Sequence, residues 1–264
     1  MLVNLVLNLV RLALWPLYAL RRARAAPKGA YVVVEIAGAI AELTPPPARR
    51  FLLARARGAA SPSVERVRAL ARALDDDPRV AGVLLKIRAI GGGEAALASM
   101  RDEVKRIRAS GKDVIAWLPD GAGNRELTLA SVARLVLLGP ETSVSALGYA
   151  AEGRYIRRAL DRAGVEPEVF ARGRYKSAGD MLARDDMSEA DKEQVGAILD
   201  ARFDALTAAV AEGRRVERDE VVRWIHEGPH TASASVALGI VDGTAYEDEL
   251  ELKIAAPLRL VEID

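Results

Sequence analysis

The sequence predicts an α/β protein in which strands and helices alternate around a largely parallel sheet. From residue 31 onward, short aliphatic runs alternate with longer segments of helical periodicity, which is typical of stacked βα units. The last third has mainly helical patterns. With 264 residues, 50% of them hydrophobic, the chain is long enough to bury the core of one large domain.

Four aliphatic runs predict strands in the first half of the folded region: Tyr31–Ile36, Val80–Ile87, Val114–Leu118 and Leu135–Leu138. Three stretches between them have helical periodicity: 61–74, 94–110 and 126–133. Pro62 suits the first turn of the first helix, and Gly111 suits the end of the second. This half therefore predicts consecutive βα units.

The second half predicts a helix at Tyr155–Ala163, a short strand at Glu168–Phe170 and a polar segment at Arg172–Ala178. Three further helices are expected over 189–213, 218–226 and 232–238, followed by a turn at 238–242 into a final strand. No internal repeat or second domain boundary is visible. We expect a leader over residues 1–24 and one folded domain over 31–264.

The leader has the pattern of an amphipathic helix. Leu2–Leu20 is apolar apart from Asn4, Asn8 and Arg11, which share one helical face. That polar stripe and Pro16 favour a helix lying in the membrane interface over a spanning helix, which needs about 20 nearly uniform apolar residues. A single spanning anchor and an ordinary docking helix are the alternatives. We expect association with the cell membrane, peripheral or by a single anchor, through residues 2–20.

Composition excludes several classes of function. The chain has no cysteine, which rules out disulfides and thiolate chemistry. Aromatic residues make up only 5%, which argues against stacking on single-stranded nucleic acid. Residues 1–30 carry five bases and no acid, whereas the rest has 33 bases against 37 acids. A basic leader on a mildly acidic body fits an anionic membrane surface, so we expect no nucleic-acid partner.

Two known sequence motifs are matched in their residue pattern but lack a feature that their function requires. His226 and His230 complete an H-E-x-x-H pattern, but Gly228-Pro229 breaks the helix that zinc binding requires. Gly121-Ala122-Gly123 lies between a strand and a helix, yet the third glycine of a dinucleotide loop is missing. We expect neither a metal nor a cofactor.

Two segments carry candidate chemistry. Gly91, Gly92 and Gly93 follow a buried strand and precede a helix, where free N–H groups can stabilise an oxyanion; a plain turn with positive φ is the alternative. The second segment is Arg172–Ala178, R-G-R-Y-K-S-A, with D-D-M-S at 185–188 downstream. A loop lysine such as Lys176 is usually solvated, and the serine of D-D-M-S suits a helix cap.

The ordered combination of the glycine turn, G-R-Y-K-S-A, R-D-D-M-S and A-L-G-I-V-D resembles the signal peptide peptidase A (protease IV) family, from about Tyr31 to Asp242. The resemblance implies a crotonase/ClpP-like spiral of βα units and a serine endopeptidase that degrades residual signal peptides at the membrane. Lys176 matches the family's general-base lysine, with Tyr175 and Ser177 as candidate supporting residues. Because that amine must be neutral, we expect it in an apolar niche, with Asp180 pointing elsewhere.

The expected nucleophile is missing from this chain. The single-repeat form of the family has a serine at the start of the helix after the third strand, where this sequence has Asn124. In the long form, a first repeat supplies the lysine and a second the serine, and this chain resembles such a first repeat. We therefore expect the serine from a second repeat or from a neighbouring chain of an oligomer, which would also supply the working oxyanion hole, and hydrophobic signal peptides as substrates.

Two other functions stay open at this point. A non-catalytic scaffold of the same fold, binding membrane peptides or partner subunits, would explain Asn124. An acyl-CoA enzyme of the wider crotonase superfamily would use the glycine turn as its oxyanion hole. The Lys176 segment argues against it, and so does the lack of an obvious catalytic carboxylate beside that turn.

Overall fold

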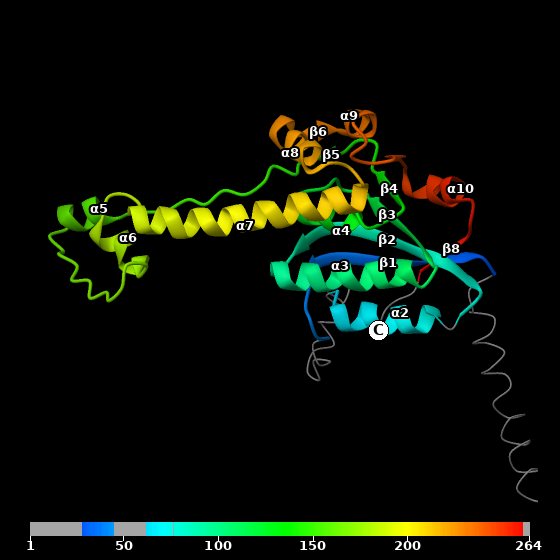
Figure 1. Ribbon diagram of the computed structural model, residues 1–264, viewed down its shortest axis with the longest axis horizontal. Coiled ribbons are helices and arrows are strands. Elements are labelled where there is room, and N and C mark those ends of the chain that lie inside the picture. The colour runs from blue at the N-terminus through cyan, green and yellow to red at the C-terminus, as the bar shows by residue number, and fades with distance from the viewer. Residues whose placement is uncertain (1–27, 45–61, 76, 261–264) are drawn as a thin grey trace, which may run out of the picture.

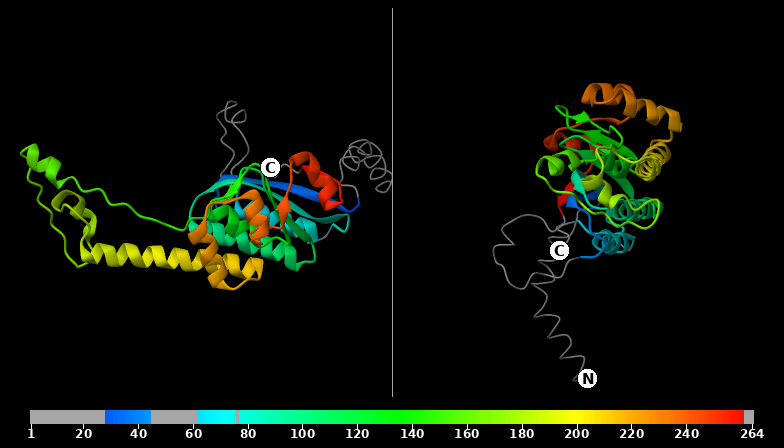
Figure 2. Two further views of the ribbon diagram at one scale, coloured as in Figure 1. Left: turned by 90° about the horizontal axis from the view of Figure 1, so that it is seen from above. Right: turned by 90° about the vertical axis from the view of Figure 1, so that its left-hand side faces the viewer.

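The computed structural model describes residues 28–44, 62–75 and 77–260. These residues form a body built on a six-stranded sheet and a long arm that projects from one end of it (Figures 1 and 2). The body contains the predicted βα units, and the predicted α/β fold class is confirmed. The predicted leader helix over residues 1–24 lies outside the described residues.

All neighbouring strands of the six-stranded sheet run parallel, in the order β7-β4-β3-β2-β1-β8. The strands are β1 Ala30–Ala39, β2 Val80–Gly91, β3 Asp113–Leu118, β4 Leu135–Leu138, β7 Gly243–Thr244 and β8 Leu258–Leu260. A separate antiparallel pair joins β5 Ser143–Val144 to β6 His230–Thr231. The central strands are mainly aliphatic because both faces of the sheet are covered.

Three helices cover one face of the sheet: α2 Val64–Asp75, α3 Glu94–Ala109 and α4 Asn124–Ala130. Their buried side chains, among them Val67, Leu97 and Met100, pack on Val34 and Leu85 in the larger core. The other face carries a smaller core that includes Leu84, Trp117 and Leu250. The last of these begins α10, Leu250–Ile254.

The C-terminal part contains α7 Glu189–Arg214, α8 Arg218–Glu227 and α9 Ala232–Ala237. Asp242 ties this part to the sheet. Its Oδ2 accepts from the Val136 N–H of β4 at 2.7 Å, and its Oδ1 pairs with Arg214 at the end of α7 at 2.7 Å. Burial acts to raise the pKa of Asp242, but the Arg214 guanidinium and the Val136 N–H together hold it below its ordinary value.

Most predicted elements are present, with shifts of a few residues at their ends. The strand expected at Glu168–Phe170 is wrong: this segment is exposed coil and belongs to neither sheet of the described chain. The strand expected directly after 238–242 is only the two-residue β7, and the last strand, β8, follows after α10. As expected, α8 ends before Gly228-Pro229, and His230 lies on β6 instead. Within the three described ranges, no helix combines the length and apolarity needed to cross a membrane.

Candidate active site

The candidate lysine lies on the arm, which we define as residues 147–205. The chain leaves the body after β5, forms α5 Arg157–Arg162, the short helix η1 Ser177–Gly179 and α6 Asp180–Ala183, and returns along α7 (Figures 1 and 2). The structure describes the whole arm, and none of its residues is buried. The arm nevertheless carries eight of the thirteen exposed large apolar side chains in the described part of the chain: Leu147, Ile156, Val165, Val169, Phe170, Tyr175, Met181 and Ile198.

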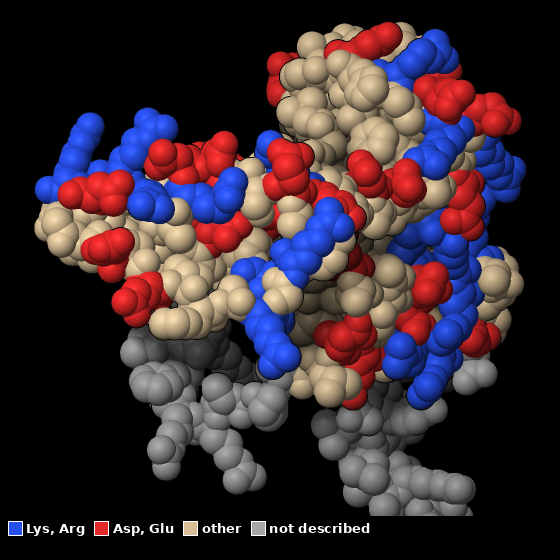
Figure 3. Space-filling model, turned by 60° about the vertical axis from the view of Figure 1, so that its left-hand side comes forward, with Lys and Arg blue, Asp and Glu red and all other residues tan. Residues whose placement is uncertain are grey.

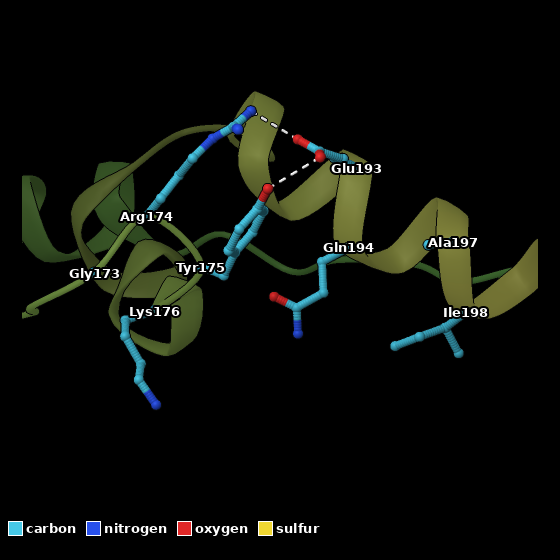
Figure 4. A pocket seen from close by; sticks show the side chains of 8 residues that line it. All are labelled: Gly173, Arg174, Tyr175, Lys176, Glu193, Gln194, Ala197 and Ile198. Atoms are coloured by element: carbon cyan, nitrogen blue, oxygen red, sulfur yellow. Dashed lines mark hydrogen bonds and ion pairs between the residues drawn. The ribbon is translucent and has the colours of Figure 1, made fainter.

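Lys176 closes a short turn on this arm. Its N–H donates to the carbonyl of Gly173 at 3.3 Å, and Gly173 has a φ of 112°, which favours glycine. The lysine side chain is exposed and borders an open hollow of about 670 Å³ on the side of α7 (Figure 4). The apolar niche expected around Lys176 is therefore wrong for the described residues of the single chain, because the arm carries the lysine away from the hydrophobic core.

The residue before the lysine fixes the loop to α7. The Tyr175 hydroxyl donates to Glu193 Oε1 at 3.0 Å, and Arg174 donates to Oε2 of the same carboxylate at 2.7 Å. The Arg174 guanidinium also lies over the Tyr175 ring, 5.1 Å from its centroid. Figure 4 shows these two side chains directed toward Glu193, while Lys176 extends in another direction. Tyr175 thus anchors the loop and leaves the amine unengaged.

Ser177, on the other side of the lysine, also binds α7. Its hydroxyl donates to Asp191 Oδ1 at 2.8 Å, so it does not contact the neighbouring amine. Asp180 lies near Tyr155, where burial and the negative charges of Asp191 and Asp180 raise the pKa of the tyrosine hydroxyl. No described carboxylate is ion-paired with Lys176. Lys192, by contrast, pairs with Glu189 at 2.7 Å.

The N-terminal turn of α7, to which this loop is bound, is stabilised by a helix cap. Ser188 is the N-cap of the helix, and its hydroxyl accepts from the Asp191 N–H at 3.3 Å, as the sequence predicted. Carboxylates in the first turn of a helix also interact favourably with the helix dipole. The residues that hold the lysine loop are therefore in the best-capped turn of the arm.

On the body, Asn124 is the first residue of α4, in the turn after β3. This is the position that, by the resemblance, corresponds to the serine of the family's single-repeat form. The Asn124 Nδ2 donates to the carbonyl of Gly148 at 2.6 Å, and its Oδ1 accepts from the N–H of Gly148 at 3.2 Å. Asparagine has no hydroxyl to form an acyl-enzyme, and here its amide is committed to the backbone.

The glycine turn lies beside the start of α4. Gly92 has a φ of 104°, and a Cβ there would come within 2.9 Å of the Ile40 carbonyl oxygen, so this position needs glycine. The Glu126 carboxylate accepts from the Ile90 N–H at 2.6 Å and from the Gly123 N–H at 3.0 Å. It thereby joins the end of β2 to the start of α4.

Sequence reasoning did not single out Glu126. Its signal is the G-x-x-E spacing at the helix start, which is a form of capping box. The acyl-CoA alternative was disfavoured because no carboxylate was evident beside the glycine turn, and Glu126 is such a carboxylate. Each of its oxygens accepts a backbone N–H, so it clamps the turn.

The lysine loop and the start of α4 do not meet within one chain. Glu193 of α7 holds the loop, while Phe203 of the same helix packs beside Gly148, next to Asn124. Ten helical residues separate these two contacts, which corresponds to about 15 Å. The chain therefore holds its candidate lysine well away from its own candidate nucleophile position.

A comparison with known protein families establishes the family to which this chain belongs. The family model described as Peptidase family S49 matches residues 106–260, more than half of the chain. The chain belongs to peptidase family S49. The matched region includes Asn124, the whole arm with Lys176, and Asp242, whereas the glycine turn precedes it.

Curated relatives agree with the S49 assignment. The chain is 26% identical over 174 residues to the chloroplastic serine protease SPPA of Arabidopsis thaliana, an alignment covering 66% of this chain and 26% of that protein. It is 30% identical over 149 residues to protease 4 of Haemophilus influenzae, covering 56% and 24%, and 32% identical over 123 residues to protease 4 of Salmonella typhi, covering 46% and 20%. The predicted signal peptide peptidase A family is confirmed, and this S49 chain spans about a quarter of the length of these relatives.

Proposed function

We propose that this S49 chain is the lysine-bearing component of a membrane-associated serine–lysine endopeptidase, and that a neighbouring repeat or chain provides the nucleophilic serine. One observation carries the proposal. Lys176 lies at an open hollow on an arm with no buried residue, while Asn124 stands where this chain would need its own serine.

The surface of the arm supports docking on a second body. Phe170 is 93% exposed, and seven further large apolar side chains of the arm are exposed. Figure 3 shows acidic and basic groups interspersed with uncharged surface on the face that it draws. Burying one large apolar side chain stabilises an interface by about 2 kcal/mol, so covering several of them favours association. The same burial would exclude water from the Lys176 amine. The apolar niche that the base requires would then form at the junction of the arm and its partner.

In the assembled site the Lys176 amine acts as the general base. Neutral Nζ takes the proton from the partner's serine Oγ as that oxygen attacks the scissile carbonyl carbon. The C–N bond then breaks, and the leaving amine receives a proton from the Lys176 ammonium. Water hydrolyses the resulting ester, with Nζ accepting the water proton, and the oxyanion donors belong to the serine-bearing body.

The substrates we propose are hydrophobic signal peptides left in or near the membrane. Support comes from the amphipathic pattern of residues 2–20 and from the basic charge of residues 1–30. Both features would hold the peptidase at an anionic lipid surface, where such peptides accumulate.

The test is co-expression of the chain with a serine-bearing S49 repeat, followed by hydrolysis of a hydrophobic peptide. Lys176→Ala should lower kcat by a factor of about 10³ or more, because loss of the base removes the route for proton transfer. Lys192→Ala is the matched control, because Lys192 is an exposed lysine on the same arm. Hydrolysis that is insensitive to Lys176→Ala would refute the proposal.

The second candidate is a non-catalytic scaffold that binds membrane peptides or partner subunits. The two hydrogen bonds between the Asn124 side-chain amide and the Gly148 backbone favour it, because they give the nucleophile position a structural use. A scaffold predicts that no assembly containing this chain reacts with a fluorophosphonate probe. Labelling of a partner serine that depends on Lys176 would exclude it.

A further inference from the structure

The root of the arm, where the chain leaves the body, makes few hydrogen bonds to the body, although Tyr149 packs against the larger core. Just before it, the Ser145 N–H still donates to the Ala122 carbonyl of the body at 2.7 Å. Gly148 follows, with a φ of 78°. In the described chain, no hydrogen bond joins residues 149–155 to the body, and the next backbone bond, from the Ile156 N–H to the Met181 carbonyl, lies within the arm. Gly148 is therefore the last hydrogen-bonded point of the outgoing segment.

Asn124 supplies both hydrogen bonds at this point. Its Nδ2 reaches the Gly148 carbonyl at 2.6 Å and its Oδ1 receives the Gly148 N–H at 3.2 Å. Together they fix the peptide groups on both sides of one α-carbon. A primary amide offers a donor and an acceptor side by side, whereas a carboxylate only accepts and a hydroxyl has a single oxygen. The residue in the nucleophile's place is thus chemically matched to this contact.

The returning helix meets the outgoing segment at the same residue. A Cβ on Gly148 would lie 3.5 Å from the Phe203 ring and 3.6 Å from Ile225, so α7 and α8 pack directly against this glycine. One residue further, the Arg202 guanidinium lies 6.0 Å from the centroid of the Tyr149 ring. The two limbs of the arm are therefore coupled where Asn124 holds Gly148.

We propose that Asn124 is a positioning residue that sets the direction of the arm and, through it, the place of Lys176. The lysine loop is attached to α7 about 15 Å beyond Phe203, the residue of α7 that packs on Gly148, so a bend of about 10° in α7 at this contact displaces the loop by about 2.5 Å. A misplacement of about 1 Å can lower a catalytic rate by about 10²-fold. The consequence for catalysis rests on the proposed function, whereas the direction of the arm does not.

The experiment measures arm direction without using activity. Because the chain has no cysteine, spin labels can be introduced at Ala73→Cys on α2 and Ala159→Cys on α5, two exposed positions, and their distance distribution measured by pulsed electron resonance. Labelled protein is diluted tenfold with unlabelled chain to suppress distances between chains. A second pair, Ala73→Cys and Leu252→Cys, reports on the body alone.

Asn124→Ala should shift the arm–body distance by about 2 to 3 Å or broaden its distribution by that amount, while the body pair stays unchanged. Asn124→Asp should not rescue the native distance, because its carboxylate faces the Gly148 carbonyl without a donor. Arg125→Ala is the matched control: the Arg125 side chain pairs with Glu94 at 3.2 Å, whereas both side-chain hydrogen bonds to Gly148 come from Asn124, so the native distance should persist.

Asn124→Ser keeps a small polar residue at the helix start and tests the same point if Asn124→Ala fails to fold. Its hydroxyl can engage only one group of Gly148 well, so an intermediate shift is expected. Native arm distances in either folded variant would overturn the proposal. So would an equal change in the body pair, because Asn124 would then support the whole fold rather than the arm.

Discussion

The body and the arm differ in where their apolar side chains lie. In the body, β3 and β4 bury every residue except their first, and Leu118, Leu138 and Met100 are fully buried. In the arm, no residue is buried, although the sequence there contains Phe170, Val169 and Met181. A segment that buries little apolar surface gains little free energy to offset its conformational entropy. The body therefore has the core of an independent domain, whereas the arm exposes apolar side chains that a binding partner would bury.

The largest expected difference between the two regions is in proteolysis. Trypsin should cut at Arg172, Arg174 and Lys176 at least about 10³ times faster than in the body. The hydrogen-bonded backbone of the body's sheet and packed helices fits a protease only after unfolding, which costs about 5 kcal/mol or more. Mass spectrometry of timed digests, restricted to peptides from 77–260, gives the two rates. Cleavage of the body sheet before the arm would contradict the comparison. A bound serine-bearing partner should slow the arm cuts selectively.

Apolar truncation should separate the regions by several kcal/mol. Leu118→Ala, at a fully buried position of β3, should lower the free energy of unfolding by about 3 to 5 kcal/mol. Ile198→Ala, at a position 49% exposed on α7, should lower it by less than about 1 kcal/mol. Urea unfolding of the isolated chain measures both. Similar losses would mean that the arm is packed in solution.

Acid should weaken the body through Asp242. Its folded-state pKa is lowered, so its contribution is present above the ordinary range near pH 4 and is lost as the pH falls through the lowered value. Asp242→Asn should cost about 2 kcal/mol at neutral pH and show less further loss on acidification. Thermal unfolding between pH 2 and 7 measures this. Asp161→Asn, which removes an exposed arm carboxylate paired with Arg157, should leave the profile unchanged.

The smallest expected effect on the isolated chain is at the most exposed apolar residue. Phe170→Asp should change the free energy of unfolding by no more than about 0.5 kcal/mol, because the ring is 93% exposed and loses no contact in a buried core. The same change should weaken binding to a serine-bearing partner, measured by titration calorimetry. Unchanged binding would show that Phe170 is not part of the docking surface.

The sequence predicted the body well because local pattern and tertiary packing agree there. Val80–Ile87 and Val114–Leu118 read as buried strands and are buried strands, and Ser188 and Gly111 mark helix ends as expected. The predictions failed for strands whose formation depends on pairing with a strand that is distant in the sequence. Glu168–Phe170 has strand-forming residues but belongs to neither sheet of the described chain, and β8 is a strand only because β1 lies beside it.

The candidate site was predictable residue by residue but not in its arrangement. The resemblance carried by R-G-R-Y-K-S-A singled out Lys176 as the candidate base and placed Asn124 at the position of the family's serine. The helix was expected to begin at residue 126, whereas α4 begins at Asn124. Three features were not foreseen: the exposure of the lysine, the roles of Tyr175 and Ser177 in anchoring its loop, and the Glu126 clamp. Each depends on a contact with a separate helix or strand, which a linear pattern does not specify.

The most direct test of the account is complementation between two chains. A serine-bearing S49 chain whose own lysine base is replaced by alanine should be inactive alone. Mixing it with this chain should restore hydrolysis of a hydrophobic peptide, and restoration should survive Lys192→Ala but disappear with Lys176→Ala. Equal restoration by the Lys176→Ala chain would contradict the claim that the arm delivers the base to another body.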